Sequence, residues 1–192
     1  MGRRTDTTAD VGLLALRLTI GGLLAGHGAQ KLFGSFGGPG LKGTAGWLES
    51  MGLKPGQTWA LMAGGSEFGS GVLMATGFLN PLGPISSFGP MLMAWDKAHR
   101  GKPIWGQAGG PEPVLIYLAA ATALAFAGPG SYSLDELFDI DVPTPLVLLT
   151  AVGVAAGVVT GMMAQPDPPP PPQEDAGRDE LQAGEAGGDH AS

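Results

Sequence analysis

Three polar side chains follow a long apolar stretch near the N-terminus. Residues 11–25 are almost wholly apolar, and His27, Gln30 and Lys31 then appear within five residues, in the run GHGAQKLFGSFGGPG at 26–40. In a helix these three positions can share one face. An imidazole that titrates near neutral pH and an amide that donates and accepts hydrogen bonds could bind a polar ligand or exchange protons. Lys31 by itself is typical of an interfacial anchor.

Further ionisable side chains lie within or beside apolar stretches: Arg17, Glu67, Asp96, His99 and Glu112. Such residues are rare in membrane helices and indicate functional sites. At a rise of about 1.5 Å per residue, Arg17 lies roughly 9 Å into the first apolar stretch and Glu67 roughly 13 Å into the second. We therefore predict a buried Arg17–Glu67 pair. The pair could fix helix register, or Glu67 could handle protons or bind the polar head of a ligand.

Five apolar segments must position these side chains. They are residues 11–29, 58–79, 84–98, 114–128 and 145–164. A membrane span needs about 20 predominantly apolar residues, so the third and fourth segments are short. The pattern predicts an all-α membrane protein, a four-helix transmembrane bundle with a fifth, C-terminal transmembrane helix, located in the cell membrane as a multi-pass protein. The alternative is a soluble all-α bundle, but the segments leave few polar helix faces.

Successive spans in opposite directions would bring several polar groups to one end of the bundle. The end of the first span, the end of the third and the start of the fourth would meet there, with His27, Gln30, Asp96, His99 and Glu112, and Glu67 would lie beneath them. We predict that this end is a pocket for a polar head group. No metal site is predicted, because His-rich zinc spacings do not occur in the chain.

Composition limits the chemistry. The 192 residues are 44% hydrophobic and 14% charged, and none is cysteine. A disulfide framework, a thiol nucleophile and a cysteine-ligated metal are therefore excluded. Residues 165–192 hold one basic and seven acidic groups, so the net charge of −7 belongs mainly to this tail. Without a basic face, we expect no nucleic-acid partner.

The chain divides by composition into four parts. We predict an N-terminal segment at 1–10, a four-helix membrane domain at 11–140, an additional transmembrane helix at 141–164 and a disordered Pro-rich acidic tail at 165–192. Within the domain, Gly65 and Gly69 are four residues apart and could let another helix approach closely. Ser133 and Glu136 form a capping box, which predicts a short surface helix.

An ordered series of motifs resembles the DoxX family of integral membrane proteins over about residues 11–140. The matching pieces are Arg17, HGAQKLFGSFGGPG, WLESMGL, GGSEFGSGVLMATGF, MLMAWDKAHRGK and the stretch from GGPEP to SLDELF. The resemblance implies a four-helix membrane bundle with polar positions at Arg17, His27, Lys31, Glu67, His99 and Glu112. It also implies association with membrane oxidoreductase systems, including thiosulfate oxidation linked to the quinone pool. The fifth helix and the tail lie outside the family pattern.

Three functions follow from these features. The chain could be a component of a membrane-associated oxidoreductase system that binds a quinone-like or other amphipathic ligand. A quinone is then the expected ligand, and the expected partners are membrane lipids and a soluble redox protein. It could instead be a non-catalytic scaffold or assembly subunit whose tail recruits a soluble partner. The third reading is a small-solute or proton pathway through the Arg17–Glu67 pair.

Overall fold

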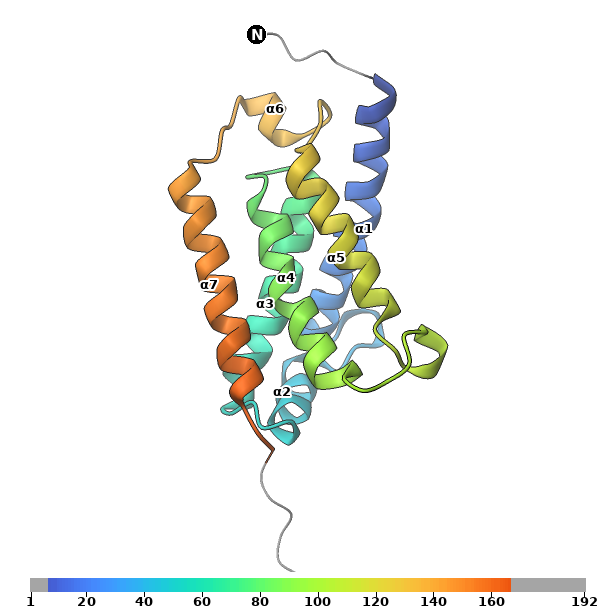
Figure 1. The fold of residues 1–192 in the computed structure, drawn as a ribbon, viewed down its shortest axis with the longest axis vertical. Coiled ribbons are helices and arrows are strands. Elements are labelled where there is room, and N and C mark those ends of the chain that lie inside the picture. The colour runs from blue at the N-terminus through green and yellow to red at the C-terminus, as the bar shows by residue number, and fades with distance from the viewer. Residues whose placement is uncertain (1–6, 167–192) are drawn as a thin grey trace, which may run out of the picture.

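The computed structural model describes residues 7–166, and every regular element within that range is helical. Five long helices run side by side, and two short ones close the ends (Figure 1). The seven helices are α1 (Thr7–Phe33), α2 (Gly40–Ser50), α3 (Gly56–Thr76), α4 (Leu82–Ala94), α5 (Glu112–Ala127), α6 (Leu134–Phe138) and α7 (Thr144–Met163). Short turns lie between them: η1 (Ser35–Gly37), the π-helical turn η2 (Trp95–His99) and η3 (Gly106–Ala108).

Four of the long helices pack in a ring. Helix α1 contacts α3, α3 contacts α4, α4 contacts α5, and α5 returns to α1. Their shared core contains Leu24, Met74, Met91, Val114 and Leu124, which come from all four helices. Helix α7 packs against α4 outside this ring.

Local chemistry explains where the two principal helices end. Helix α1 has Asp10 in its first turn and Lys31 in its last, which suits the helix dipole. Gly34 follows α1 with φ of 71°, and Gly77 ends α3 with φ of 64°. Both values lie in the left-handed region that glycine adopts without a steric cost, so both glycines are natural helix stops.

A helix lies at each of the five predicted apolar segments, and one further helix, α2, was not predicted. None of the five segments includes residues 40–50, which form α2. Thr44 and Leu48 occupy its buried face, and the spacing of four explains why this short segment can pack as a helix. The predicted cap of α6 is present, because Ser133 Oγ accepts a hydrogen bond from Glu136 N at 3.2 Å.

By length and hydropathy, two described helices qualify as membrane spans. They are α1 and α7, with mean hydropathies of 1.5 and 2.2 in their most apolar windows. Helix α3 is long enough but less hydrophobic, and α4 and α5 are shorter. The predicted tail lies beyond Pro166 and so falls outside the described residues, as does most of the predicted N-terminal segment. Residues 7–10 of that segment belong to α1.

A row of glycines sets the contact between α1 and α3. A Cβ added at Gly21 would lie 2.7 Å from the Gly71 carbonyl oxygen, and one added at Gly28 would lie 2.7 Å from that of Gly64. The two backbones therefore touch at both levels, and neither helix can carry a side chain there. The seven-residue spacing within each helix keeps both contacts on one face.

The prediction of close packing at Gly65 and Gly69 was wrong. A Cβ added at either position would meet no atom within 4 Å. Gly65 lies one residue after the contact glycine Gly64, and Gly69 lies two residues before the contact glycine Gly71. Each residue turns a helix by about 100°, so both positions lie off the contact face.

Candidate functional site

The glycine contacts place Arg17 and Glu67 at different depths, so the predicted Arg17–Glu67 pair is wrong. The antiparallel register brings Arg17 level with Gly77, and a Cβ added at Gly77 would lie within 1.8 Å of Arg17 Nη1. The same register brings Glu67 level with His27. The ten residues from Arg17 to His27 correspond to roughly 15 Å along the helix, which is too far for an ion pair.

Glu67 instead forms an ion pair with Lys31. The Lys31 Nζ atom donates to Glu67 Oε2. Side chains lean toward the N-terminus of their own helix, so Lys31 on α1 and Glu67 on antiparallel α3 lean toward each other. The Glu67 side chain is 5% exposed and that of Lys31 is 24% exposed. Lys31, read from sequence as an interfacial anchor, is therefore the counter-ion of the most buried acid in the ring.

Tyr117 and His27 adjoin this ion pair from α5 and α1. The His27 and Tyr117 rings meet edge to face with centroids 6.2 Å apart. The Tyr117 side chain also packs against the shared core of the four-helix ring. His27 Nδ1 lies 3.1 Å from Gln30 Oε1. We call Lys31, Glu67, Tyr117, His27 and Gln30 the polar cluster.

The polar cluster contains His27, Gln30 and Glu67 from the predicted set, and it adds two residues. Lys31 had been set aside as an anchor, and Tyr117 was not considered because it lies within an apolar run of α5. The cluster combines the Lys31–Glu67 ion pair with the half-buried phenol of Tyr117 and the exposed imidazole of His27. Such a set can hold the polar head of a ligand and exchange protons with it.

Arg17 lies at the opposite end of the ring and is 2% exposed. Its Nη2 donates to the Tyr132 carbonyl oxygen at 2.7 Å. Arg17 Nε and Nη1 are buried and have no hydrogen-bond partner among residues 7–166. Gly77 is required beneath this side chain, since a Cβ there would occupy the place of Nη1.

Asp135 is a buried acid that sequence reasoning did not single out. Its two carboxylate oxygens accept hydrogen bonds from Leu79 N and Asn80 N, each at 2.7 Å. The carboxylate thus fixes the α3–α4 turn to α6. Asp135 belongs to the sequence SLDE, which predicts the N-terminal cap of a short helix. That pattern gives no sign that Asp135 also binds the α3–α4 turn.

The remaining predicted residues have local partners near the cluster's end of the ring. Asp96 pairs with Arg100 and lies 3.6 Å from Lys97 Nζ. His99 Nδ1 lies 2.7 Å from the Gly109 carbonyl oxygen, so this nitrogen carries the proton. Glu112 Oε2 accepts from Gly106 N at 2.8 Å. These contacts fold the η2–η3 loop and do not reach the polar cluster.

Across the part of the chain that the structure describes, His, Asp and Glu side chains do not gather in threes as metal ligands would.

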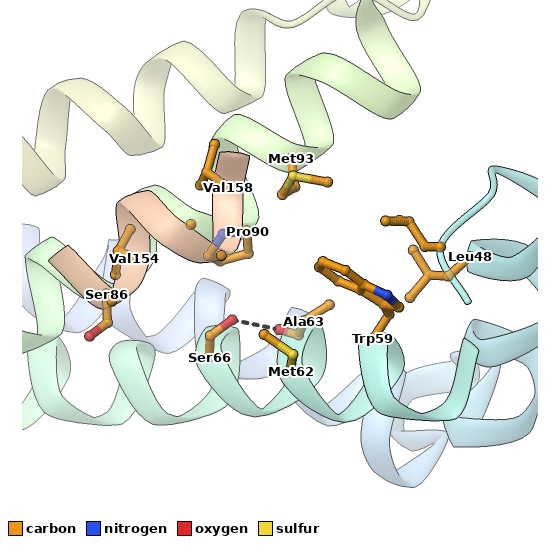
Figure 2. Close-up of a pocket in the computed structure, with 14 residues that line it drawn as sticks. Leu48, Trp59, Met62, Ala63, Ser66, Ser86, Pro90, Met93, Val154 and Val158 are labelled. Carbon is orange, nitrogen blue, oxygen red and sulfur yellow. Dashed lines mark hydrogen bonds between the residues drawn. The ribbon is translucent and has the colours of Figure 1, made fainter. Parts of the chain in front are cut away.

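An apolar pocket of about 260 Å³ lies between α3, α4 and α7. Trp59, Met93 and Val158 project toward it from the three helices (Figure 2). On α3 the pocket is lined by Ser66, the neighbour of Glu67, so pocket and cluster occupy faces about 100° apart on one helix. The apolar cavity and the titratable groups, predicted to form one site, are therefore two separate sites.

These features define the class of protein. Every regular element of residues 7–166 is helical, two apolar helices have membrane-spanning length, and the largely apolar ring buries Arg17 and the Lys31–Glu67 pair. Residues 12–100 match the DoxX family model. This match identifies residues 12–100 as a DoxX domain, as the motifs indicated. No curated protein and no solved structure matches it.

Proposed function

We propose that this protein is a multi-pass component of a membrane-associated oxidoreductase system, and that its polar cluster binds the head group of a quinone-like or other amphipathic ligand. One observation carries the proposal. The Lys31–Glu67 pair joins α1 to α3 inside the ring near one of its ends, with the Glu67 side chain 5% exposed and the Lys31 side chain 24% exposed. Burying two charges is costly, so a pair retained in such a place indicates a function beyond stability. The oxidoreductase assignment rests on the family resemblance.

The donor set suits a carbonyl-bearing head group. The Lys31 ammonium and the Tyr117 hydroxyl can donate to ligand oxygens, and Glu67 can accept from a reduced, hydroxyl-bearing form. Reduction of a quinone takes up two electrons and two protons. His27 and Lys31 are partly exposed and can relay protons from water. The chain has no cysteine, so the electrons come from a soluble redox partner or a second bound ligand.

The soluble partner is proposed to bind at the α2 end of the ring. The chain leaves α7 there, where Lys97 Nζ donates to the Ala164 carbonyl oxygen at 2.7 Å. The acidic residues beyond position 165 begin at this end, so they are attached beside any partner bound to it. Deleting residues 167–192 is expected to reduce recovery of the partner in a mild-detergent pull-down. If the same amount of partner is recovered without residues 167–192, the tail does not recruit the partner.

The multi-pass arrangement can be tested directly, because the chain has no native cysteine. Single cysteines are placed at Lys42 and Asp141, which lie on exposed positions at opposite ends of the ring. In intact cells or sealed vesicles, a membrane-impermeant maleimide should label one of the two and spare the other. Labelling of both from the same side would contradict the proposed crossing.

The ligand is tested by purifying the full chain in mild detergent and quantifying bound quinones by mass spectrometry. Glu67→Gln and Lys31→Gln should each lower the bound quinone at least tenfold, because each removes a charged group of the cluster. Lys42→Gln is the matched control, since Lys42 is exposed on α2. Wild-type protein without quinone, or equal retention by all four proteins, would contradict the proposal.

A further inference from the structure

The apolar pocket between α3, α4 and α7 has a wall that the DoxX match does not include. Its α3 and α4 linings lie within residues 12–100, whereas Gly153, Val154, Gly157 and Val158 belong to α7. Without α7, this side of α3 and α4 would be an open surface. The added helix therefore creates the pocket.

Missing side chains keep the pocket open. A Cβ added at Gly153 or Gly157 would meet no atom within 4 Å, and one at Gly89 would meet Val154 Cγ1 at 3.7 Å. Packed protein interiors leave few spaces larger than a water molecule. A cavity of about 260 Å³ flanked by three glycines is thus a space that the sequence leaves unfilled.

The lining selects an apolar occupant. None of its fourteen residues is charged, and Ser66 Oγ already donates to the Ala63 carbonyl oxygen at 3.1 Å (Figure 2). An apolar cavity of about 150 Å³ is known to stay free of water and to bind benzene. The larger volume here accommodates a longer hydrocarbon segment, and the pocket is open on one side rather than closed.

Contacts at the C-terminal end of α7 hold the wall in place. Gly161 fits against Met93 and Trp59, and a Cβ at this position would lie 2.5 Å from Met93 Cε. The Lys97–Ala164 hydrogen bond fixes the end of the helix. These contacts hold α7 against α3 and α4, so α7 is a fixed wall of the pocket.

We propose that this pocket binds one acyl chain of a membrane phospholipid. The pocket provides no unpaired charge or free amide for a head group, so only a hydrocarbon tail is expected to enter it. One end of the pocket is formed by Leu48, Leu53 and Trp59 at the α2 end of the ring, and tryptophan side chains favour the depth of lipid head groups. The head group lies there while the tail follows α3 and α7. This site is independent of the polar cluster and of the proposed quinone function.

The test uses the full chain in phosphatidylcholine vesicles in which a fraction of the lipid carries a diazirine in mid-chain. After illumination, adducts are mapped by mass spectrometry. Wild-type protein should carry adducts on the pocket residues Met93 and Val154, as well as on the exposed Leu149 of α7. In Gly157→Leu the new side chain fills the pocket, so the pocket adducts should fall at least fivefold relative to those on Leu149. Gly157→Ala should give an intermediate loss.

Gly22→Leu is the matched control, because it adds the same side chain at an open position of α1, a helix that does not line the pocket. Its pocket adducts should equal those of wild type. The proposal is overturned if wild-type pocket residues carry no adducts, or if Gly157→Leu leaves them unchanged while its thermal unfolding matches wild type. It is also overturned if a prenylated quinone added to the vesicles displaces the adducts stoichiometrically, or if cross-linking shows a second copy of the chain in the pocket.

Discussion

Replacing Lys31 by methionine is the sharpest test of the polar cluster. The substitution keeps a long apolar stem but removes the ammonium, which leaves the Glu67 carboxylate without its counter-ion. The Glu67 side chain is 5% exposed, so water cannot replace the lost interaction. We therefore expect Lys31→Met to destabilise the protein much more than loss of a surface charge would.

The size of the effect follows from the burial of the two partners. Breaking a buried ion pair costs about 3–5 kcal/mol, whereas an exposed pair contributes about 0–1 kcal/mol. Because Lys31 remains 24% exposed, the lower end of the buried range applies, and we expect a loss of about 3 kcal/mol. The double variant Lys31→Met/Glu67→Gln removes both charges and should recover most of that loss.

A double-mutant cycle measures this coupling. Unfolding is followed in detergent by tryptophan fluorescence for wild type, both single variants and the double variant. A coupling of about 2 kcal/mol or more between Lys31 and Glu67 is expected, and additive effects within about 0.5 kcal/mol would refute the pair. A parallel cycle with Arg17→Met and Glu67→Gln should be additive, because the register keeps these residues apart. Strong coupling there would refute the register itself.

Three other substitutions test other parts of the fold. Gly28→Ala should lower stability by about 1–3 kcal/mol through overpacking, while Gly22→Ala, at an open position, should be neutral or stabilising in thermal unfolding. Asp135→Asn should lower the unfolding temperature, with a loss of about 1–3 kcal/mol, because the amide leaves only one of the two acceptors that hold the α3–α4 turn; a change as small as that in Asp141→Asn would contradict this role. Lys97→Gln should weaken the end of α7 by about 1 kcal/mol, seen as faster hydrogen exchange in its last turn alone.

The sequence predicted the helices well because the information is local. Runs of apolar residues bounded by Gly and Pro are enough to place α1, α3, α4, α5 and α7. The SLDE cap similarly predicted α6. Helix α2 was missed because its glycines and the preceding Gly-Pro run favour a loop, and only packing of Thr44 and Leu48 against the ring stabilises it.

The side-chain partners were harder to predict because they depend on register. The depths of Arg17 and Glu67 were estimated without knowing which glycines form the α1–α3 contact. A contact at Gly64 rather than Gly65 turns a different face of α3 toward α1. The tilt of side chains toward each helix N-terminus then selects Lys31 rather than Arg17 as the partner. His99 and Glu112 were placed at the correct end, but their loop contacts could not be read from spacing.

The uneven hydropathy of the helices has a consequence for biogenesis. In the proposed multi-pass arrangement, α1 and α7 are apolar enough to enter the bilayer from the translocon unaided, whereas α3 carries Glu67 and a row of glycines. Helix α3 is therefore expected to enter stably only when α1 is already present, with Lys31 available to neutralise Glu67 and the glycine faces ready to meet. The Lys31–Glu67 ion pair would then make the insertion of α3 depend on the presence of α1 during synthesis, before any ligand binds.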